Sequence, residues 1–137
     1  MDDWYIDIMT ANLVNKSIRN QFQVVLLPNL YGDIITDEAA QIQGGVGTAG
    51  SANIGDRFAM FESIHGSAPR LMELGLGDYA NPQSILKAEA MLLRHICRPQ
   101  AAQKLEKALG DCPVTVTGDR DGATCKAYTD TLLTMLS

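Results

Sequence analysis

The stretch NLYGDIITDEAAQ, residues 29–41, decides which fold class this 137-residue chain adopts. It follows QVVLLP (residues 23–28), an uninterrupted apolar run ending in proline, which predicts a strand buried on both faces. From about residue 33 the pattern predicts a helix that ends near residue 43, where two glycines follow. A buried strand followed directly by a helix is the alternation that builds α/β folds.

The rest of the chain continues this alternation. The glycine-rich stretch GGVGTAGSANIGD (residues 44–56) predicts an ordered loop, and HGSAPR (residues 65–70) predicts a loop rich in turns. Apolar spacing indicates the remaining elements. We expect helices over residues 5–14, 83–96, 99–109 and 122–136, and strands over residues 58–62 and 114–118.

Apolar residues at helical spacing indicate which helix faces are buried. Pro82 suits the first turn of the helix expected after it, and Gly110 marks the end of the next one. The expected apolar stripes consist of Ile85, Met91, Leu92 and Ile96 in one helix, and of Tyr128, Leu132, Met135 and Leu136 in the last.

Composition and charge exclude several classes of protein. The net charge is −5 and the 11 lysines and arginines are scattered, so the basic stripe that nucleic acid requires is missing. No apolar run reaches the roughly 18 residues of a membrane span, and the first residues are acidic where a signal peptide would be basic. Cys97, Cys112 and Cys125 form no CxxC motif, which indicates reduced thiols. We expect a cytoplasmic protein.

Two aspartates, Asp33 and Asp37, stand four residues apart in the predicted helix. Side chains at this spacing share one face, with β-carbons about 6 Å apart. Two carboxylates so placed repel each other unless a cation lies between them, and Mg²⁺ or Mn²⁺ prefers such oxygen ligands. Alternatively, the helix dipole stabilises Asp33 near the helix N-terminus and Asp37 is simply solvated.

A longer pattern surrounds this pair. Asn29, Gly32, Asp33, Asp37 and the glycines through Gly55 share a spacing that resembles the isocitrate/isopropylmalate dehydrogenase family, the metal-dependent β-decarboxylating dehydrogenases. The resemblance continues through HGSAPR, ANP and the closing DRDGAT and YTDTLL segments. It covers essentially the whole chain, but only the C-terminal portion of the family's chain.

The resemblance implies a mixed sheet flanked by helices, of which this chain would form an incomplete part. Residues 1–43 would belong to the central subdomain that forms the dimer and carries the metal site. Residues 44–137 would form the C-terminal part of the subdomain on the cofactor side. A Rossmann fold is excluded because no GxGxxG motif follows a strand.

The resemblance also implies a metal site shared between two chains. Asp33 and Asp37 would bind Mg²⁺ or Mn²⁺, and Asp7 would reach across a homodimer interface into the partner's site. Alternatively, Asp7 is simply a surface aspartate in a helix. The family's catalytic tyrosine and lysine belong to segments upstream of those present. We therefore assign no catalytic residue, decline Lys16 for that role, and expect no turnover from these 137 residues alone.

The loop HGSAPR is the expected cofactor site. Small residues at Gly66, Ser67 and Ala68 let backbone N–H groups approach an anion, and Pro69 stiffens the turn. The resemblance implies that this loop holds the adenosine half of NAD or NADP. From the residue pattern alone, His65 is also explained as a structural turn residue.

Four more residues complete the implied cofactor site. His65 would lie beside the adenine, Asn81 would bond the base, and Glu62 would lie toward the nicotinamide. Relatives that use NAD usually carry aspartate after the proline, where a carboxylate binds ribose hydroxyls. This chain has Arg70, whose guanidinium would attract the 2′-phosphate of NADP.

The resemblance thus implies an NADP-linked isocitrate dehydrogenase, which oxidises and decarboxylates a small-molecule substrate with a metal and a dinucleotide. Isopropylmalate or homoisocitrate dehydrogenase is the alternative within the family. A truncated, non-catalytic interaction or regulatory chain is the alternative from another class. Nucleic acid and membranes are not expected partners.

Overall fold

The computed structural model describes residues 2–137. The chain divides into two compact units, Met1–Gly45 and Val46–Ser137, called here the N-terminal unit and the C-terminal unit. This division falls two residues after the expected boundary at residue 43, whereas the roles expected for the two parts stay predictions.

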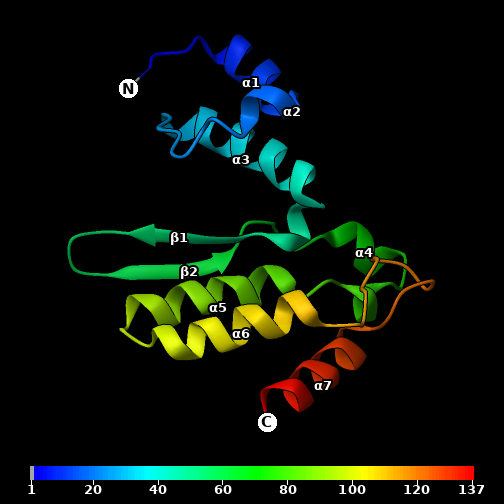
Figure 1. Ribbon diagram of the computed structural model, residues 1–137. Helices are drawn as coiled ribbons and strands as arrows, with labels where there is room; N and C mark the ends of the chain where they lie inside the picture. Colours follow the sequence, from blue (N-terminus) through cyan, green and yellow to red (C-terminus); the bar gives the residue numbers. More distant parts are fainter. Residues whose placement is uncertain (1) are drawn as a thin grey trace. The chain divides into compact units, whose positions relative to one another are not determined.

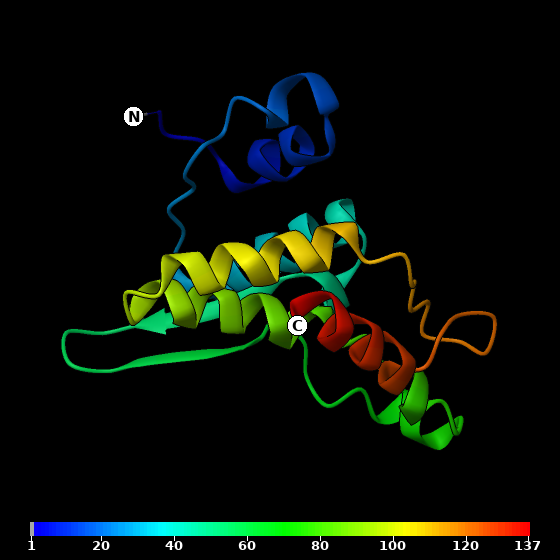
Figure 2. The same ribbon diagram turned by 60° about the horizontal axis from the view of Figure 1, so that its bottom comes forward.

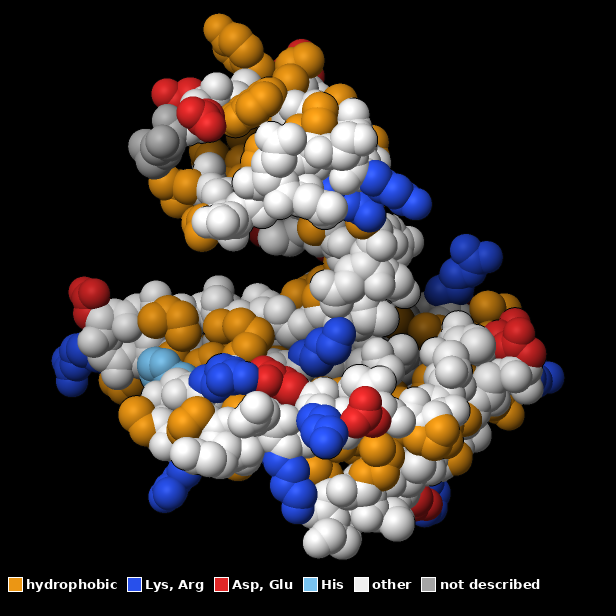
Figure 3. All heavy atoms as spheres, in the orientation of Figure 1, with side chains coloured by type: hydrophobic (Ala, Val, Ile, Leu, Met, Phe, Trp, Pro, Cys, Tyr) orange, Lys and Arg blue, Asp and Glu red, His pale blue; other side chains and the backbone are white. Residues whose placement is uncertain are grey.

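The described part of the N-terminal unit contains three helices, α1 (Ile6–Val14), α2 (Lys16–Arg19) and α3 (Asn29–Gln43) (Figure 1). Helix α1 contacts both α2 and α3. Within the described part of this unit only Met9, Ile35 and Ala40 are buried. So small a core leaves many apolar side chains of this unit exposed (Figure 3).

Helix α3 begins earlier than the sequence predicts. Pro28 holds the extended backbone of the capping position with φ −61° and ψ 155°, and the helix starts at Asn29. Its end agrees with expectation, because Gly44 follows Gln43 with φ 135°, a conformation that favours glycine. The early start places Asp33 in the second helical turn.

The predicted strand over residues 23–28 does not form, and this expectation is wrong. The segment is irregular, and the side chains of Val24 and Leu26 are 90% and 89% exposed. A strand gains its backbone hydrogen bonds only from a neighbouring strand. Among residues 2–137 the only sheet pairs β1 with β2, so this run has no strand beside it.

The C-terminal unit combines one β-hairpin with helices. Helix α5 contacts both strands of the hairpin and also contacts α6, which runs beside it (Figures 1 and 2). Helix α7 contacts α6 and η2. In chain order the elements are η1 (Val46–Thr48), β1 (Gly50–Ile54), β2 (Ala59–Ser63), α4 (Pro69–Glu73), η2 (Gly77–Tyr79), α5 (Gln83–His95), α6 (Pro99–Asp111) and α7 (Cys125–Leu136).

Strand β1 lies inside the glycine-rich stretch of residues 44–56, so the prediction that this whole stretch is a loop is wrong. It pairs antiparallel with β2, with Gly50 opposite Ser63 and Ile54 opposite Ala59. A β-carbon built on Gly50 would lie 2.5 Å from the backbone nitrogen of Ala88 in α5. This glycine therefore lets the strand approach the helix rather than marking a turn.

The buried face of α5 also differs from the expected apolar stripe. Ile85 and Ile96 are 51% and 53% exposed, whereas Ser84, Ala88 and Ala90 are buried. Small side chains are needed because α5 packs closely against the hairpin and α6. The sequence predicted that the largest apolar residues of this helix are buried. The smallest are buried instead, because the neighbouring backbones approach the helix closely.

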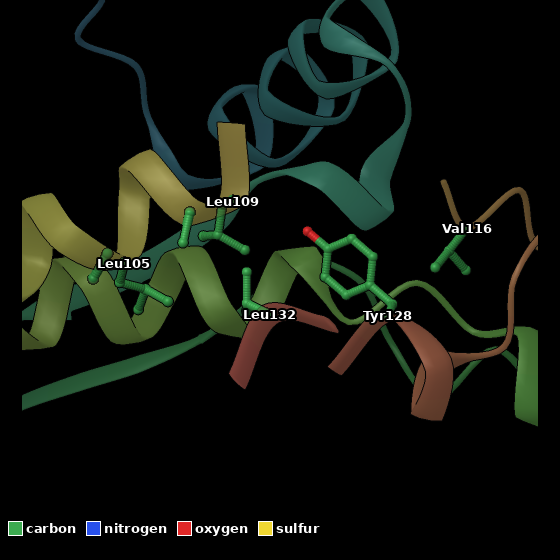
Figure 4. Close-up of a cluster of buried hydrophobic side chains, with 7 residues drawn as sticks. Leu105, Leu109, Val116, Tyr128 and Leu132 are labelled. Carbon is green, nitrogen blue, oxygen red and sulfur yellow. The ribbon is translucent and has the colours of Figure 1, made fainter. Parts of the chain in front are cut away.

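The main core lies where α5, α6 and α7 meet the segment between α6 and α7. Side chains of α6 and α7 face one another there (Figure 4). As expected for the last helix, Tyr128 and Leu132 are buried, whereas Met135 is 37% exposed. The cluster consists of Ala90, Leu105, Ala108, Leu109, Val116, Tyr128 and Leu132.

The predicted strand over residues 114–118 is the second one that does not form. Burial still alternates, because Val116 is buried while Thr115 and Thr117 are exposed. The Thr115 carbonyl accepts one hydrogen bond from the Ala123 amide, at 3.0 Å. The segment is thus extended and half-buried, but no partner strand runs beside it in residues 2–137.

Helix α6 extends to Asp111, past the glycine that was expected to end it. Gly110 lies inside the helix and lacks the positive φ of a glycine that ends one, so the helix continues through it. In the described part of the chain no helix has the length and apolar character to cross a membrane.

Candidate functional site

The carboxylates of Asp33 and Asp37 lie one turn apart on α3, and both residues are exposed. Within residues 2–137 neither carboxylate takes part in a hydrogen bond or an ion pair. Because α3 starts at Asn29, Asp33 lies beyond the first turn, where the stabilising effect of the helix dipole is concentrated. The dipole alternative for Asp33 is therefore weakened, and the carboxylates remain available to an external cation.

Asp7 lies in the first turn of α1 and is also exposed. Its Oδ1 accepts a hydrogen bond from the amide of Ile8 at 2.8 Å. No group of three or more histidine, cysteine, aspartate or glutamate side chains in residues 2–137 is arranged to hold a metal ion. The chain thus offers two carboxylates together on α3 and a third separately on α1.

The loop between β2 and α4 holds most of the predicted cofactor residues. Ala68 ends the loop in the left-handed conformation with φ 47°, and Pro69 opens α4 at the position where proline is favoured. Nδ1 of His65 donates a hydrogen bond to the Gly66 carbonyl at 2.8 Å. This bond orients the imidazole, so the turn function of His65 is present alongside any role toward a ligand.

Glycine at position 66 has no explanation from packing within the described chain. A β-carbon there would meet no atom within 4 Å, and φ is not in the left-handed region. Ser67 beside it is exposed. A loop with small exposed residues and unhindered backbone is suited to the close approach of an external anionic group.

Asn81 lies at the start of α5, where its Oδ1 accepts a hydrogen bond from the Gln83 amide at 2.9 Å. A β-carbon on Gly47 would lie 3.4 Å from the β-carbon of Asn81, so η1 passes directly beside this side chain. Its oxygen is thus engaged in capping the helix. The side-chain NH₂ group can still donate to a ligand.

Glu62 and Arg70 carry the charges near this loop. Oε1 of Glu62 accepts a hydrogen bond across the hairpin from the Nδ2 of Asn53 at 2.8 Å, and the residue is exposed on β2. Arg70 is exposed in the first turn of α4. In the described residues its guanidinium forms no ion pair, since the two salt bridges there are Arg94–Glu106 and Lys126–Asp130.

One residue of this region was missed by sequence reasoning. Ser84 is fully buried; its hydroxyl donates to the Ala49 carbonyl and accepts from the Ile64 amide at 3.2 Å. It thereby connects the residue before β1 to the residue after β2. The available signal was a serine in the first turn of a helix whose face was expected to be apolar.

Comparison with known proteins places these motifs in one family. The family model described as isocitrate/isopropylmalate dehydrogenase matches residues 1–131. The isocitrate dehydrogenase (NADP) of Rickettsia bellii is 49% identical over 107 residues, which are 78% of this chain and 21% of that protein. The 3-isopropylmalate dehydrogenase of Methanothermobacter thermautotrophicus is 42% identical over 107 residues, covering 78% of this chain and 31% of the relative.

A solved structure agrees with this assignment. The isocitrate dehydrogenase from Methylococcus capsulatus superposes with a TM-score of 0.87 at 33% sequence identity, over 98% of this chain and 40% of that one. The chain therefore spans less than half the length of each of these three relatives. With a family model matched over residues 1–131, the chain belongs to the isocitrate/isopropylmalate dehydrogenase family.

Proposed function

We propose that this chain supplies the metal-binding and dinucleotide-binding residues of a metal-dependent, NADP-linked isocitrate dehydrogenase. The observation that carries the proposal is the pair Asp33 and Asp37, which present exposed carboxylates one turn apart on α3. Like charges at this spacing destabilise a helix, so a bound cation offers a reason for them.

The residues on α3 fit a hard divalent ion. Carboxylate oxygens are the ligands that Mg²⁺ and Mn²⁺ prefer, and two of them leave positions for water and substrate oxygens. When bound, the ion would supply Lewis-acid stabilisation of negative charge on the substrate. Asp33 and Asp37 would hold it, and Asp7 from a second copy in a homodimer would add a third carboxylate.

The loop of residues 64–70 would bind the adenosine half of the cofactor. Gly66 and Ser67 would let the backbone approach the ligand, and the NH₂ group of Asn81 would donate to the base. Arg70 would pair with the 2′-phosphate, which favours NADP over NAD. Glu62 would lie toward the nicotinamide half.

Proton transfer is assigned to no residue of this chain. The side chains described above would bind and orient the ligands, and the groups that exchange protons with the substrate would lie outside residues 1–137. We propose that residues 1–137 alone have no measurable turnover, and that the complete activity requires groups outside them.

Two other functions compete with this proposal. The 3-isopropylmalate dehydrogenase relative is 42% identical to this chain, so a substrate of the isopropylmalate type is the alternative within the family. A non-catalytic chain that associates with another protein is the second alternative, and the exposed apolar side chains of the N-terminal unit favour it. The metal separates these classes, because an association module has no need of it.

The test is Mn²⁺ binding by the 137-residue protein. Titration calorimetry and electron paramagnetic resonance measure the dissociation constant. We expect binding that Asp33→Asn and Asp37→Asn each weaken about tenfold or more, because each variant removes one charged ligand. Glu38→Asn is the matched control, since it removes a neighbouring carboxylate from the same helix. Equal affinity in all three variants would overturn the metal assignment.

The substrate is tested in the same experiment. Isocitrate and 3-isopropylmalate are each added to the protein with Mn²⁺, and a tighter ternary complex with isocitrate is expected. Tighter binding of 3-isopropylmalate would favour 3-isopropylmalate dehydrogenase over isocitrate dehydrogenase. NADP reduction by the purified chain with isocitrate would contradict the proposed lack of turnover.

A further inference from the structure

The structure assigns a positioning role to Ser84: its hydroxyl fixes the loop of residues 64–68 in the conformation that binds the dinucleotide. This inference rests on the proposed function for the ligand of that loop. Its structural part, the restraint on the loop, is measurable without a ligand.

The Ser84 hydroxyl bonds two backbone groups. Ser84 is in the first turn of α5 and fully buried, and its Oγ donates to the carbonyl of Ala49. The same oxygen accepts a hydrogen bond from the amide of Ile64 at 3.2 Å. One hydroxyl thus uses its single proton and a lone pair to join two segments that are far apart in sequence.

Both bonded groups lie at the base of the predicted cofactor site. Ala49 precedes β1 and Ile64 follows β2, so the two groups flank the open end of the hairpin. Ile64 is also the first residue of the loop that continues to Ala68, the left-handed residue directly before α4. The Ser84 hydroxyl therefore holds the point from which the loop departs.

The rest of the loop is exposed or bonded locally. Gly66 has open space on the side of its missing β-carbon, and residues 66–68 are exposed. Other hydrogen bonds of the loop are local, from the His65 ring to the Gly66 carbonyl and from the Ser63 hydroxyl to the His65 carbonyl at 3.4 Å. The Ala68 carbonyl accepts one from the Leu71 amide at 3.0 Å, within the first turn of α4. Among these bonds, that of Ser84 is the one that ties the loop to a helix distant in sequence.

Loss of the hydroxyl leaves the Ala49 carbonyl and the Ile64 amide without their partner, and such groups seek water or move. Ser84→Ala keeps nearly the same volume and favours the helix, so the variant is expected to fold. The matched control is Ala90→Gly, which weakens α5 at a buried position on its other side without touching either loop segment.

Two measurements on the full 137-residue protein test the inference. Amide hydrogen exchange of residues 64–68 is followed without ligand, and the dissociation constant for NADP is measured by calorimetry. In Ser84→Ala we expect exchange of the Ile64 amide to rise about tenfold and the dissociation constant to rise at least about fivefold. In Ala90→Gly we expect a lower melting temperature with neither change.

The outcomes separate this inference from the proposed function. Unchanged Ile64 exchange in Ser84→Ala, or the same increase in both variants, would overturn the positioning role. If the unsubstituted protein binds neither NADP nor NAD, the proposed ligand of the loop is wrong. The exchange result then decides alone whether Ser84 restrains the loop.

Discussion

At the scale of single residues, glycines and aspartates carry the strongest information. Asp33 and Asp37 are predictable because helical spacing alone places them on one face. Gly50 and Gly66 look alike in sequence but serve different purposes. The first is required by a neighbouring helix backbone, whereas the second has open space around it. Only the fold distinguishes a glycine needed for packing from one that leaves room for a ligand.

This difference predicts opposite effects of alanine. Gly50→Ala should lower the free energy of unfolding by about 1–3 kcal/mol, because the new β-carbon would overlap the backbone of Ala88. Gly66→Ala should leave stability within about 0.5 kcal/mol, as a surface change does. Urea denaturation of both variants measures this, and equal losses of stability would contradict the packing described for β1 and α5.

At the scale of elements, α5 connects the hairpin, α6 and the candidate cofactor loop. Its consecutive residues Gln83 and Ser84 point to different partners, since the Gln83 side-chain NH₂ group donates to the Tyr128 hydroxyl of α7 at 3.1 Å. On its far end, Arg94 pairs with Glu106 of α6 through two hydrogen bonds. These contacts fix α5 against α6, α7 and the residues that flank the hairpin. A substitution in α5 is therefore expected to affect both the candidate cofactor loop and the core.

Tyr128 makes the core sensitive to alkaline pH. Burial raises the pKa of Tyr128 above the ordinary tyrosine value, because the ionised phenol is poorly solvated there. The unfolded chain therefore releases this proton first, near pH 10, and the folded form loses stability as pH rises from there toward the raised pKa. The contribution of the protonated Tyr128 phenol to the free energy of unfolding is fully present below pH 10.

The measurement is urea denaturation at pH 8, 10 and 11. We expect the free energy of unfolding of the unsubstituted protein to fall between pH 10 and pH 11. In Tyr128→Phe this fall should be smaller. An identical pH dependence in the two proteins would contradict the assignment to Tyr128. Tyr5→Phe is the control, because Tyr5 is 86% exposed and outside the core.

At the scale of the whole molecule, the two units differ in how much apolar surface they bury. The C-terminal unit has a connected core, whereas in the described part of the N-terminal unit three residues are buried. Exposed apolar side chains there include Tyr5, Val24, Leu26, Leu30 and Ile34. Exposed apolar surface of this kind promotes association between proteins.

We therefore expect the chain to self-associate with increasing concentration. Light scattering after size-exclusion chromatography should show species heavier than the 137-residue monomer. Leu26→Lys should shift the population toward monomer, because Leu26 is 89% exposed in the irregular apolar segment. Leu133→Lys, at a residue 60% exposed on α7, is the control, and a monodisperse monomer at all concentrations would contradict the expectation.

The sequence by itself determined the family, the motif positions and the existence of most helices. Caps, glycines and 3.6-residue spacing are local signals, which explains why the ends of α3 and α7 agree with expectation and why α1 begins within one residue of it. The start of α7, expected at residue 122, lies at Cys125. The sequence placed Asp33 and Asp37 on one helix by the same local signals. Helix α4 was not expected, and it takes Pro69 and Arg70 out of the loop predicted over residues 65–70.

Only the tertiary structure decided which apolar segments pair and which faces are buried. Residues 23–28 and 114–118 have strand-like sequences but lack a strand beside them within residues 2–137, because pairing depends on distant chain segments. The face of α5 was decided by how closely β1 and α6 approach it, which favours Ala88 over Ile85. The bonds of Ser84 likewise exist only because folding brings Ala49 and Ile64 to the same helix.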